Sequence, residues 1–173
     1  MTEPPRRLVL LRHAKAEYSG FPDSNRVLSP AGRRQAAEVG ISLASGGLVP
    51  DLVLCSSAVR TQQTCELVVD AWGGASWVVV TDDLYGAGVA DVVEVVGEAP
   101  PQARTVLVVG HEPVMSGVAS VLAGDGSSRE ALTRVRSGVP TATYSVLELP
   151  GAWDDLRPGG AVLADVVLPA RRL

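Results

Sequence analysis

Three short, uninterrupted apolar runs constrain the fold of this chain more than any other feature. They are LVLL at 8–11, LVLC at 52–55 and TVLVV at 105–109. Continuous Val/Leu runs of this length are typical of strands buried on both faces, as in a parallel sheet covered by helices. The sequence therefore predicts an α/β fold with these runs as its central strands.

Each run is followed at once by polar residues that can do chemistry. Arg12-His13 follows the first run, Arg60 comes shortly after the second, and His111 follows the third after one glycine. Ligands of open α/β sheets bind beyond the carboxyl ends of the strands, so we expect these four side chains to converge in one pocket. A single histidine is usually a hydrogen-bonded structural residue. Here, however, the only two histidines both follow predicted strands, which favours phosphate chemistry with a histidine nucleophile.

The remaining elements alternate in type along the chain. Ser29 and Pro30 predict a helix start, and helical spacing continues to Gly46-Gly47. Further helices are expected from Ser57 to about Trp72, over 91–98, and after Pro113, the last burying Val114, Val118, Val121 and Leu122. Strands are expected at 77–81, 143–149 and 161–168, with the last two as an antiparallel hairpin.

These elements predict one three-layer α/β/α sandwich with a mainly parallel sheet and an antiparallel edge. Residues 8–173 form a single domain in this interpretation, and residues 1–7 a disordered tail.

Charge and composition bear on partners and location. The net charge of −4, without a basic run, argues against nucleic acid or an anionic membrane as a partner. Every apolar stretch ends well before the ~18 residues of a membrane span, and the N-terminus lacks the apolar core of a secretion signal. Cys55 and Cys65 are expected to be reduced core thiols of a cytoplasmic protein, because two cysteines do not make a metal-binding quartet. No metal and no cofactor are expected.

Four motifs in order carry a family resemblance. They are LVLLRHAKA at 8–16, LSPAG at 28–32, SSAVRTQQT at 56–64 and VGHEP at 109–113. Together they resemble the histidine phosphatase superfamily, which includes the phosphoglycerate mutases and acid phosphatases. The alanine after His13, the short chain and Gly-His-Glu-Pro are most similar to its small phosphohistidine phosphatase branch, the SixA type. The resemblance implies a phosphoglycerate mutase-like fold and a catalytic core of Arg12, His13, Arg60 and His111.

The chemistry of these residue types agrees with that core. The two arginines would clamp phosphate oxygens with planar, permanently charged forks. His13 would attack through a neutral ring nitrogen while its other nitrogen donates to a backbone carbonyl. His111 would bind the oxyanion, protonated when phosphate is present. Ser19 and Ser57 are further candidate phosphate donors, although Ser57 is better explained as a helix cap.

A general acid is less evident in the sequence. Asp82, Asp83 and Glu112 are candidates, but the first two suit a solvated turn, and Glu112 suits a helix start. Asp23 and Arg26, in the loop expected to cover the site, suit an ion pair that stabilises it. A missing acid favours phosphohistidine as substrate, because imidazole leaves far more readily than an alkoxide.

The sequence thus predicts a phosphatase that works through a phosphohistidine enzyme intermediate. Its expected partner is a phosphorylated protein, most plausibly one carrying phosphohistidine, or a small phosphorylated metabolite. A general phosphomonoesterase of the same fold is the alternative. An alternative of another class is a phosphate- or phosphoprotein-binding module without turnover, although the intact set of four residues argues against a decayed site.

Overall fold

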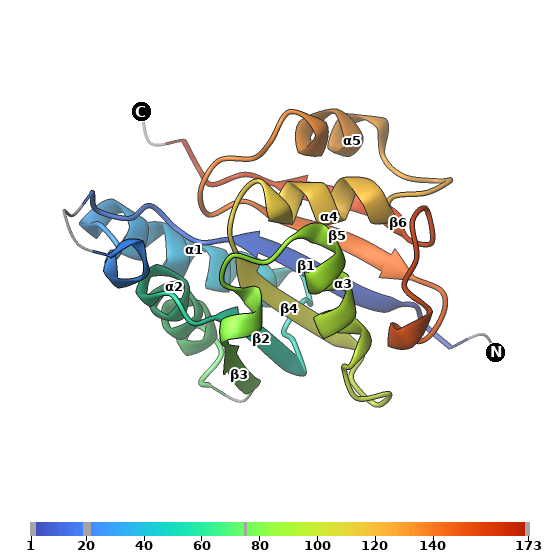
Figure 1. The fold of residues 1–173 in the computed structure, drawn as a ribbon, viewed down its shortest axis with the longest axis horizontal. Helices are drawn as coiled ribbons and strands as arrows, with labels where there is room; N and C mark the ends of the chain where they lie inside the picture. Colours follow the sequence, from blue (N-terminus) through green and yellow to red (C-terminus); the bar gives the residue numbers. More distant parts are fainter. Residues whose placement is uncertain (1–2, 19–21, 75, 172–173) are drawn as a thin grey trace.

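The computed structural model of the chain describes residues 3–18, 22–74 and 76–171. One six-stranded sheet organises this part of the protein (Figure 1). The strands are β1 (Arg6–Arg12), β2 (Leu52–Ser56), β3 (Trp77–Thr81), β4 (Thr105–Gly110), β5 (Tyr144–Leu149) and β6 (Val162–Val167). Their order in space is β3-β2-β4-β1-β5-β6. The first four are parallel, and the β5–β6 hairpin pairs antiparallel beside β1, as the sequence predicts.

Helices cover both faces of the sheet. One face carries α1 (Pro30–Ser45) and α2 (Val59–Asp70), and the other carries α3 (Val89–Gly97), α4 (Val114–Leu122) and α5 (Arg129–Arg136). Side chains of β1 alternate between two buried clusters: Val9 and Leu11 face α1 and α2, while Leu8 and Leu10 face the other three helices. This two-sided burial explains the continuous apolar run and confirms the three-layer α/β/α sandwich.

The start of α1 fixes the chain that follows the first strand. The side chain of Ser29 accepts a hydrogen bond from the backbone of Gly32, which confirms the expected cap. The backbone of Ser29 also donates to the carbonyl of Lys15 at 2.9 Å. A Cβ atom at Gly32 would overlap the Lys15 backbone, so glycine is needed for this close approach. The helix thereby holds the segment just after His13.

Two boundaries differ from the sequence prediction. Strand β1 begins at Arg6, and the N–H of Arg7 bonds to the carbonyl of Arg104 at 2.9 Å, so both residues lie in the sheet and not in a tail. Helix α2 begins at Val59 with Ala58 as its cap residue, so the expected cap at Ser57 is wrong. The turn is closed instead by the Thr61 hydroxyl, which donates to the carbonyls of Ser56 and Ala58.

Two helices on the second face also depart from expectation. Val121 of α4 is 41% exposed, while Met115 and Ala119 are buried in its place, so the inward stripe is shifted. Helix α5 was not predicted, because Ala131 and Val135 are its only fully buried residues and its other positions are mostly polar. Its serine cap, Ser128, accepts from the backbone of Ala131 at 3.2 Å.

No helix in the described ranges is long and apolar enough to cross a membrane. Both cysteines, Cys55 and Cys65, are free thiols in the core, as expected.

Candidate active site

Parallel pairing brings three strand ends together at one edge of the sheet. Strands β2, β4 and β1 are consecutive neighbours, and Arg12 is in register with Gly110. His13 and His111 therefore leave adjacent strands side by side, with ring centroids 5.4 Å apart. Arg60 reaches both rings from the first turn of α2. The expected convergence of the two histidines and Arg60 is thus present.

His13 is held in one orientation by a hydrogen bond at each ring nitrogen. Nδ1 lies 2.7 Å from the carbonyl oxygen of Ala14, and Nε2 lies 3.3 Å from Nε of Arg60. Arginine can only donate, so Nε2 is the unprotonated nitrogen and Nδ1 donates to the carbonyl. This tautomer, protonated on Nδ1 and not on Nε2, is the one predicted from the sequence for a histidine nucleophile.

Burial and neighbouring charge keep His13 neutral. The residue is only 7% exposed. Burial is the largest factor lowering its pKa, and Arg60, His111 and Arg12 lower it further, to about 4, against the opposing hydrogen bond to Ala14. Nε2 is therefore unprotonated at neutral pH, with its lone pair accepting the hydrogen bond from Arg60.

His111 is held between an arginine and a serine. Its Nδ1 lies 3.2 Å from Nη2 of Arg60, and its Nε2 lies 2.9 Å from the hydroxyl of Ser56. Burial lowers the pKa of His111 to about 4, helped by the charges of Arg60 and Arg12 and opposed by Asp23. The lowered pKa favours a neutral His111 at neutral pH, and its protonation when phosphate is bound stays a prediction.

Asp23 connects the loop after β1 to this cluster. Its carboxylate accepts from Nη2 of Arg60 at 2.9 Å, from the Tyr85 hydroxyl at 3.0 Å and from Arg26 at 3.2 Å. Burial alone would raise the pKa of Asp23, but these three hydrogen bonds outweigh it and lower the pKa to about 2. The ion pair with Arg26 is confirmed. The contacts to Arg60 and Tyr85 were missed, because these partners lie 37 and 62 residues along the chain.

Arg12 is the last residue of β1, directly before His13. Its Nη1 donates to the carbonyl of Val139 at 2.8 Å, and its buried Nε has no hydrogen-bond partner within the described ranges. An unsatisfied buried guanidinium nitrogen is costly, so Arg12 has an unused hydrogen-bond donor next to His13 in the chain.

Glu112 has a structural role in this arrangement. One carboxylate oxygen accepts from the backbone of Ser116 at 2.8 Å, and the other accepts from the Ser116 hydroxyl at 2.6 Å and from the backbone of Val139 at 3.2 Å. These bonds tie the first turn of α4 to the segment that holds Arg12. These contacts agree with the sequence-based interpretation of Glu112 as a residue at the start of a helix.

The other expected residues lie outside the cluster. Asp82 and Asp83 are exposed in a 3-10 turn at Asp82–Leu84, and neither hydrogen-bonds to the cluster among the residues the structure describes. Ser56, and not Ser57, is the serine that meets His111. Ser19 lies outside the described residues. Ser56 was missed because it ends a buried strand, where its hydroxyl has no distinctive sequence signal.

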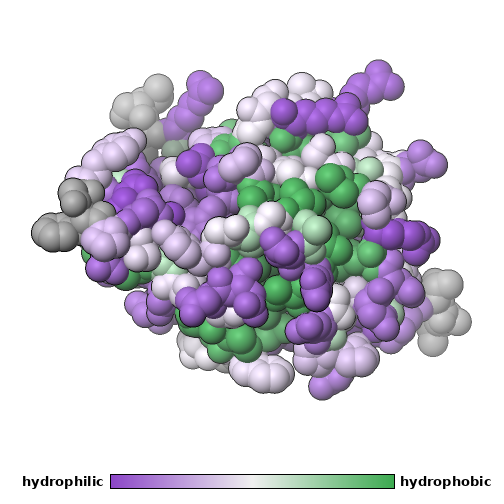
Figure 2. Space-filling view, viewed as in Figure 1, coloured by the Kyte–Doolittle hydropathy of each residue, from purple (hydrophilic) through white to green (hydrophobic). Residues whose placement is uncertain are grey.

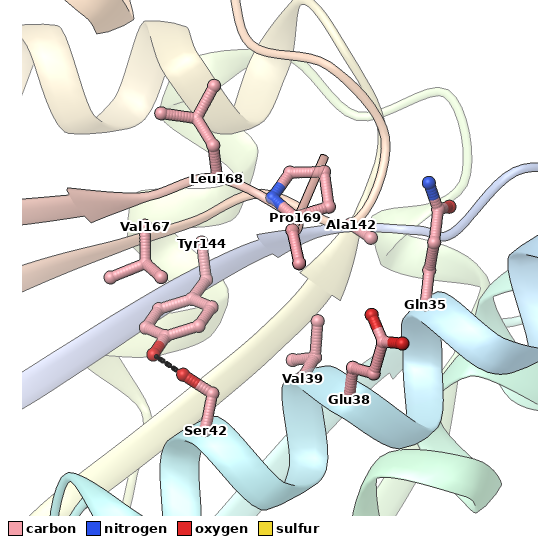
Figure 3. A pocket seen from close by; sticks show the side chains of 10 residues that line it. Gln35, Glu38, Val39, Ser42, Ala142, Tyr144, Val167, Leu168 and Pro169 are labelled. Atoms are coloured by element: carbon pink, nitrogen blue, oxygen red, sulfur yellow. Dashed lines mark hydrogen bonds between the residues drawn. The ribbon is translucent and has the colours of Figure 1, made fainter. Parts of the chain in front are cut away.

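A pocket lined in part by Ala142 lies near the same edge of the sheet. This pocket of about 250 Å³ lies between α1 and the ends of β5 and β6, and Tyr144 in its wall hydrogen-bonds to Ser42 at 2.7 Å (Figure 3). Its described lining holds the carboxyl side chain of Glu38 and no cationic side chain. It therefore does not suit a phosphate, in contrast to the histidine cluster. No group of three or more potential metal ligands occurs in the described ranges.

A neutral imidazole nitrogen beside an arginine and a second imidazole is an arrangement that can support transfer of a phosphoryl group. Comparison with known proteins agrees with this class. Residues 8–88 match the family model of the histidine phosphatase superfamily, branch 1. An uncharacterized protein of Mycobacterium tuberculosis is 36% identical over 162 residues, covering 92% of this chain and 99% of the relative.

Two solved structures are also similar over nearly their whole length. A candidate phosphohistidine phosphatase SixA from Nakamurella multipartitia is 37% identical, with a TM-score of 0.84 over 98% of this chain and 100% of the other. A candidate SixA from Agrobacterium tumefaciens is 30% identical, with a TM-score of 0.79 over 95% and 99%. The chain belongs to the histidine phosphatase superfamily and is of the SixA type. It is a hydrolase, and its fold and family are those of a phosphatase.

Proposed function

We propose that this phosphatase hydrolyses phosphohistidine in proteins through a covalent intermediate on His13. Arg12 and Arg60 hold the phosphoryl oxygens, and His111 stabilises the charge that develops on them. The proposed enzyme works in the cytoplasm and needs neither a metal ion nor a cofactor.

The reaction proceeds in two displacements. Nε2 of His13 attacks phosphorus, and the P–N bond to the substrate imidazole breaks as that ring takes the electron pair. When the other nitrogen of the substrate ring carries a proton, the ring departs as neutral imidazole. Water then attacks phospho-His13, phosphate leaves, and the lone pair returns to Nε2. The bond from Nδ1 to the Ala14 carbonyl persists throughout and keeps the ring aligned.

The observation that best supports this proposal is the ionisation and hydrogen bonding of the carboxylates near His13. Asp23 has a pKa of about 2 and is ionised at neutral pH, so it has no proton to donate. Glu112 is engaged by Ser116 and Val139 through both of its oxygens. An alkoxide leaving group needs a proton donor, whereas a protonated phosphoramidate does not. Among the residues that the structure describes, no carboxylic acid is poised to donate to this cluster, which suits phosphohistidine better than a phosphate ester.

The relatives support the same substrate class. The two similar structures from Nakamurella multipartitia and Agrobacterium tumefaciens are both described as candidate phosphohistidine phosphatases. Their similarity spans nearly the whole of this chain.

The test compares turnover of a phosphohistidine-bearing protein with that of an alkyl phosphate such as glycerol phosphate, whose alkoxide leaving group needs a proton donor, using wild type and His13→Ala. We expect rapid loss of phosphohistidine, little ester cleavage, and a fall of at least about a thousandfold in the variant. A radiolabelled phosphoryl group should be trapped on wild type and not on the variant. Val121→Thr, an exposed change on α4, serves as the control.

Other outcomes would reject the proposal in distinct ways. Ester cleavage as fast as phosphohistidine cleavage would indicate a working general acid and a general phosphomonoesterase. Binding of a phosphorylated peptide without turnover of either substrate would indicate a binding module. Full activity of a folded His13→Ala variant would exclude the covalent intermediate.

A further inference from the structure

A mostly apolar pocket of about 230 Å³ shares His111 with the catalytic cluster. It lies between the loop that follows the Asp82–Leu84 turn and the start of α4. Buried side chains that form its walls include Leu84, Val92 and Met115, and its rim includes Ala87 and Val114. None of the reactions described above uses this pocket.

The charges around the pocket exclude an anion as its occupant. Apart from His111, its only ionisable lining residue is Glu112, whose carboxylate faces Ser116 and Val139. Arg12 and Arg60 are not among its lining residues. A phosphate group would find no cation here, whereas an apolar group would lose water-exposed surface against Leu84, Val92 and Met115.

The position of His111 connects the pocket to the phosphoryl site. One edge of its ring meets Arg60 and Ser56, and Tyr85 packs against the ring at a centroid distance of 5.8 Å. An extended peptide advances about 3.3–3.6 Å per residue, so a residue adjacent to a bound phosphohistidine reaches past the His111 ring. The surface in this direction is apolar, because hydrophobic residues gather over α3 and α4 (Figure 2).

We propose that this pocket receives an apolar side chain of the protein substrate, from a residue next to the phosphohistidine. The inference rests on the proposed function and makes it more specific. The pocket is smaller than the roughly 300 Å³ and more of sites for whole small molecules, and it fits one side chain. Substrates with leucine, methionine or valine beside the phosphohistidine are then preferred over those with serine.

The test measures a preference within each enzyme variant. Two phosphohistidine peptides differ only in leucine or serine beside the phosphohistidine, and free phosphohistidine is the third substrate. The quantity compared is kcat/KM for the leucine peptide divided by kcat/KM for the serine peptide. This ratio cancels any general loss of folded or active enzyme.

Two variants and one control are compared with wild type. Val114→Thr makes the rim polar without changing its shape, and Ala87→Leu fills the pocket. Val121→Thr makes the same chemical change as the first variant on the same helix, but outside the pocket. We expect a ratio of about ten for wild type and for the control, and a ratio near one for both pocket variants.

Other results would overturn the inference. Three results would show that the pocket does not recognise this substrate residue. They are a ratio near one for wild type, a ratio of about ten for either pocket variant, and a ratio near one for the control. These results differ from failure of the proposed function, in which wild type would not hydrolyse free phosphohistidine at all.

Discussion

Nε of Arg60 lies 3.3 Å from Nε2 of His13 and donates to the lone pair that would attack phosphorus. The same guanidinium lies 3.2 Å from Nδ1 of His111 through Nη2. Because arginine only donates, this one side chain selects the tautomer of both rings. In the proposed mechanism, Arg60 therefore orients the nucleophile in addition to binding a phosphoryl group.

A lysine at position 60 should be a poor substitute for this arginine. Lysine keeps the charge but lacks the planar fork that reaches both rings and Asp23 at once. We expect Arg60→Lys to lower kcat/KM for a phosphohistidine substrate by about a hundredfold. Arg134→Lys is the control, because Arg134 pairs with Glu130 on the surface of α5, outside the cluster. Equal losses in the two variants would contradict a specific role for the Arg60 fork.

The lowered pKa values of the histidines predict a loss of stability in acid. His13 has a pKa of about 4 in the folded protein and about 6.5 when unfolded, so between these pH values the unfolded chain binds more protons. The contribution of a neutral histidine to the free energy of unfolding is complete above about pH 6.5. It falls as pH decreases toward 4, by up to about 3 kcal/mol for His13. His111 acts in the same direction.

Urea unfolding at several pH values between 7 and 4 measures this effect. We expect the free energy of unfolding of wild type to fall more steeply with decreasing pH than that of His13→Asn. The difference between the two curves removes the contribution of carboxylates that titrate in the same range. Parallel curves would mean that His13 is not the group responsible.

Asp23 and Asp82 offer a matched pair of carboxylates. Asp23 holds Arg60, Arg26 and the Tyr85 hydroxyl, whereas Asp82 is exposed in a turn. Asp23→Asn should lower kcat/KM for phosphohistidine by about tenfold, because Arg60 loses its ionic partner. Asp82→Asn and Asp83→Asn should leave it within about twofold. A large loss in either of these last two variants would identify the missing general acid.

Glu112 should affect stability more than turnover. Glu112→Gln removes an acceptor for one of the bonds from Ser116 and Val139 and should cost about 1–2 kcal/mol of unfolding free energy, measured by urea denaturation. The kcat for a phosphohistidine substrate should change by less than about threefold. A much larger fall in kcat, with stability unchanged, would instead support Glu112 as an acid.

Local sequence signals predicted the elements whose burial is simple. The runs at 8–11, 52–55 and 105–109 are apolar throughout because helices cover both faces of their strands. Ser29 followed by Pro30 predicted the start of α1 correctly, because the cap is satisfied within three residues. Helix α5 was missed because a short amphipathic helix on the surface has too few apolar positions to show a period.

The contacts of Asp23 show which interactions can be predicted from local sequence and which depend on the tertiary structure. Arg26 lies three residues after Asp23 in the chain, and the sequence predicts their ion pair. The hydrogen bonds of Asp23 to Arg60 and Tyr85 depend instead on where the fold places the loop after β1 relative to α2. Ser56 was also missed, because its contact with His111 arises from the pairing of β2 with β4.

The amino-acid sequence by itself determined the fold class, the family and the meeting of His13, Arg60 and His111 at the sheet edge, because strand burial and motif order are properties of the linear chain. Only the tertiary structure decided the tautomers of His13 and His111, the engagement of Asp23 and Glu112, and the apolar pocket beside His111. These features depend on distances between groups far apart in sequence and on the burial that shifts their pKa values, and both exist only once the strands and helices are packed.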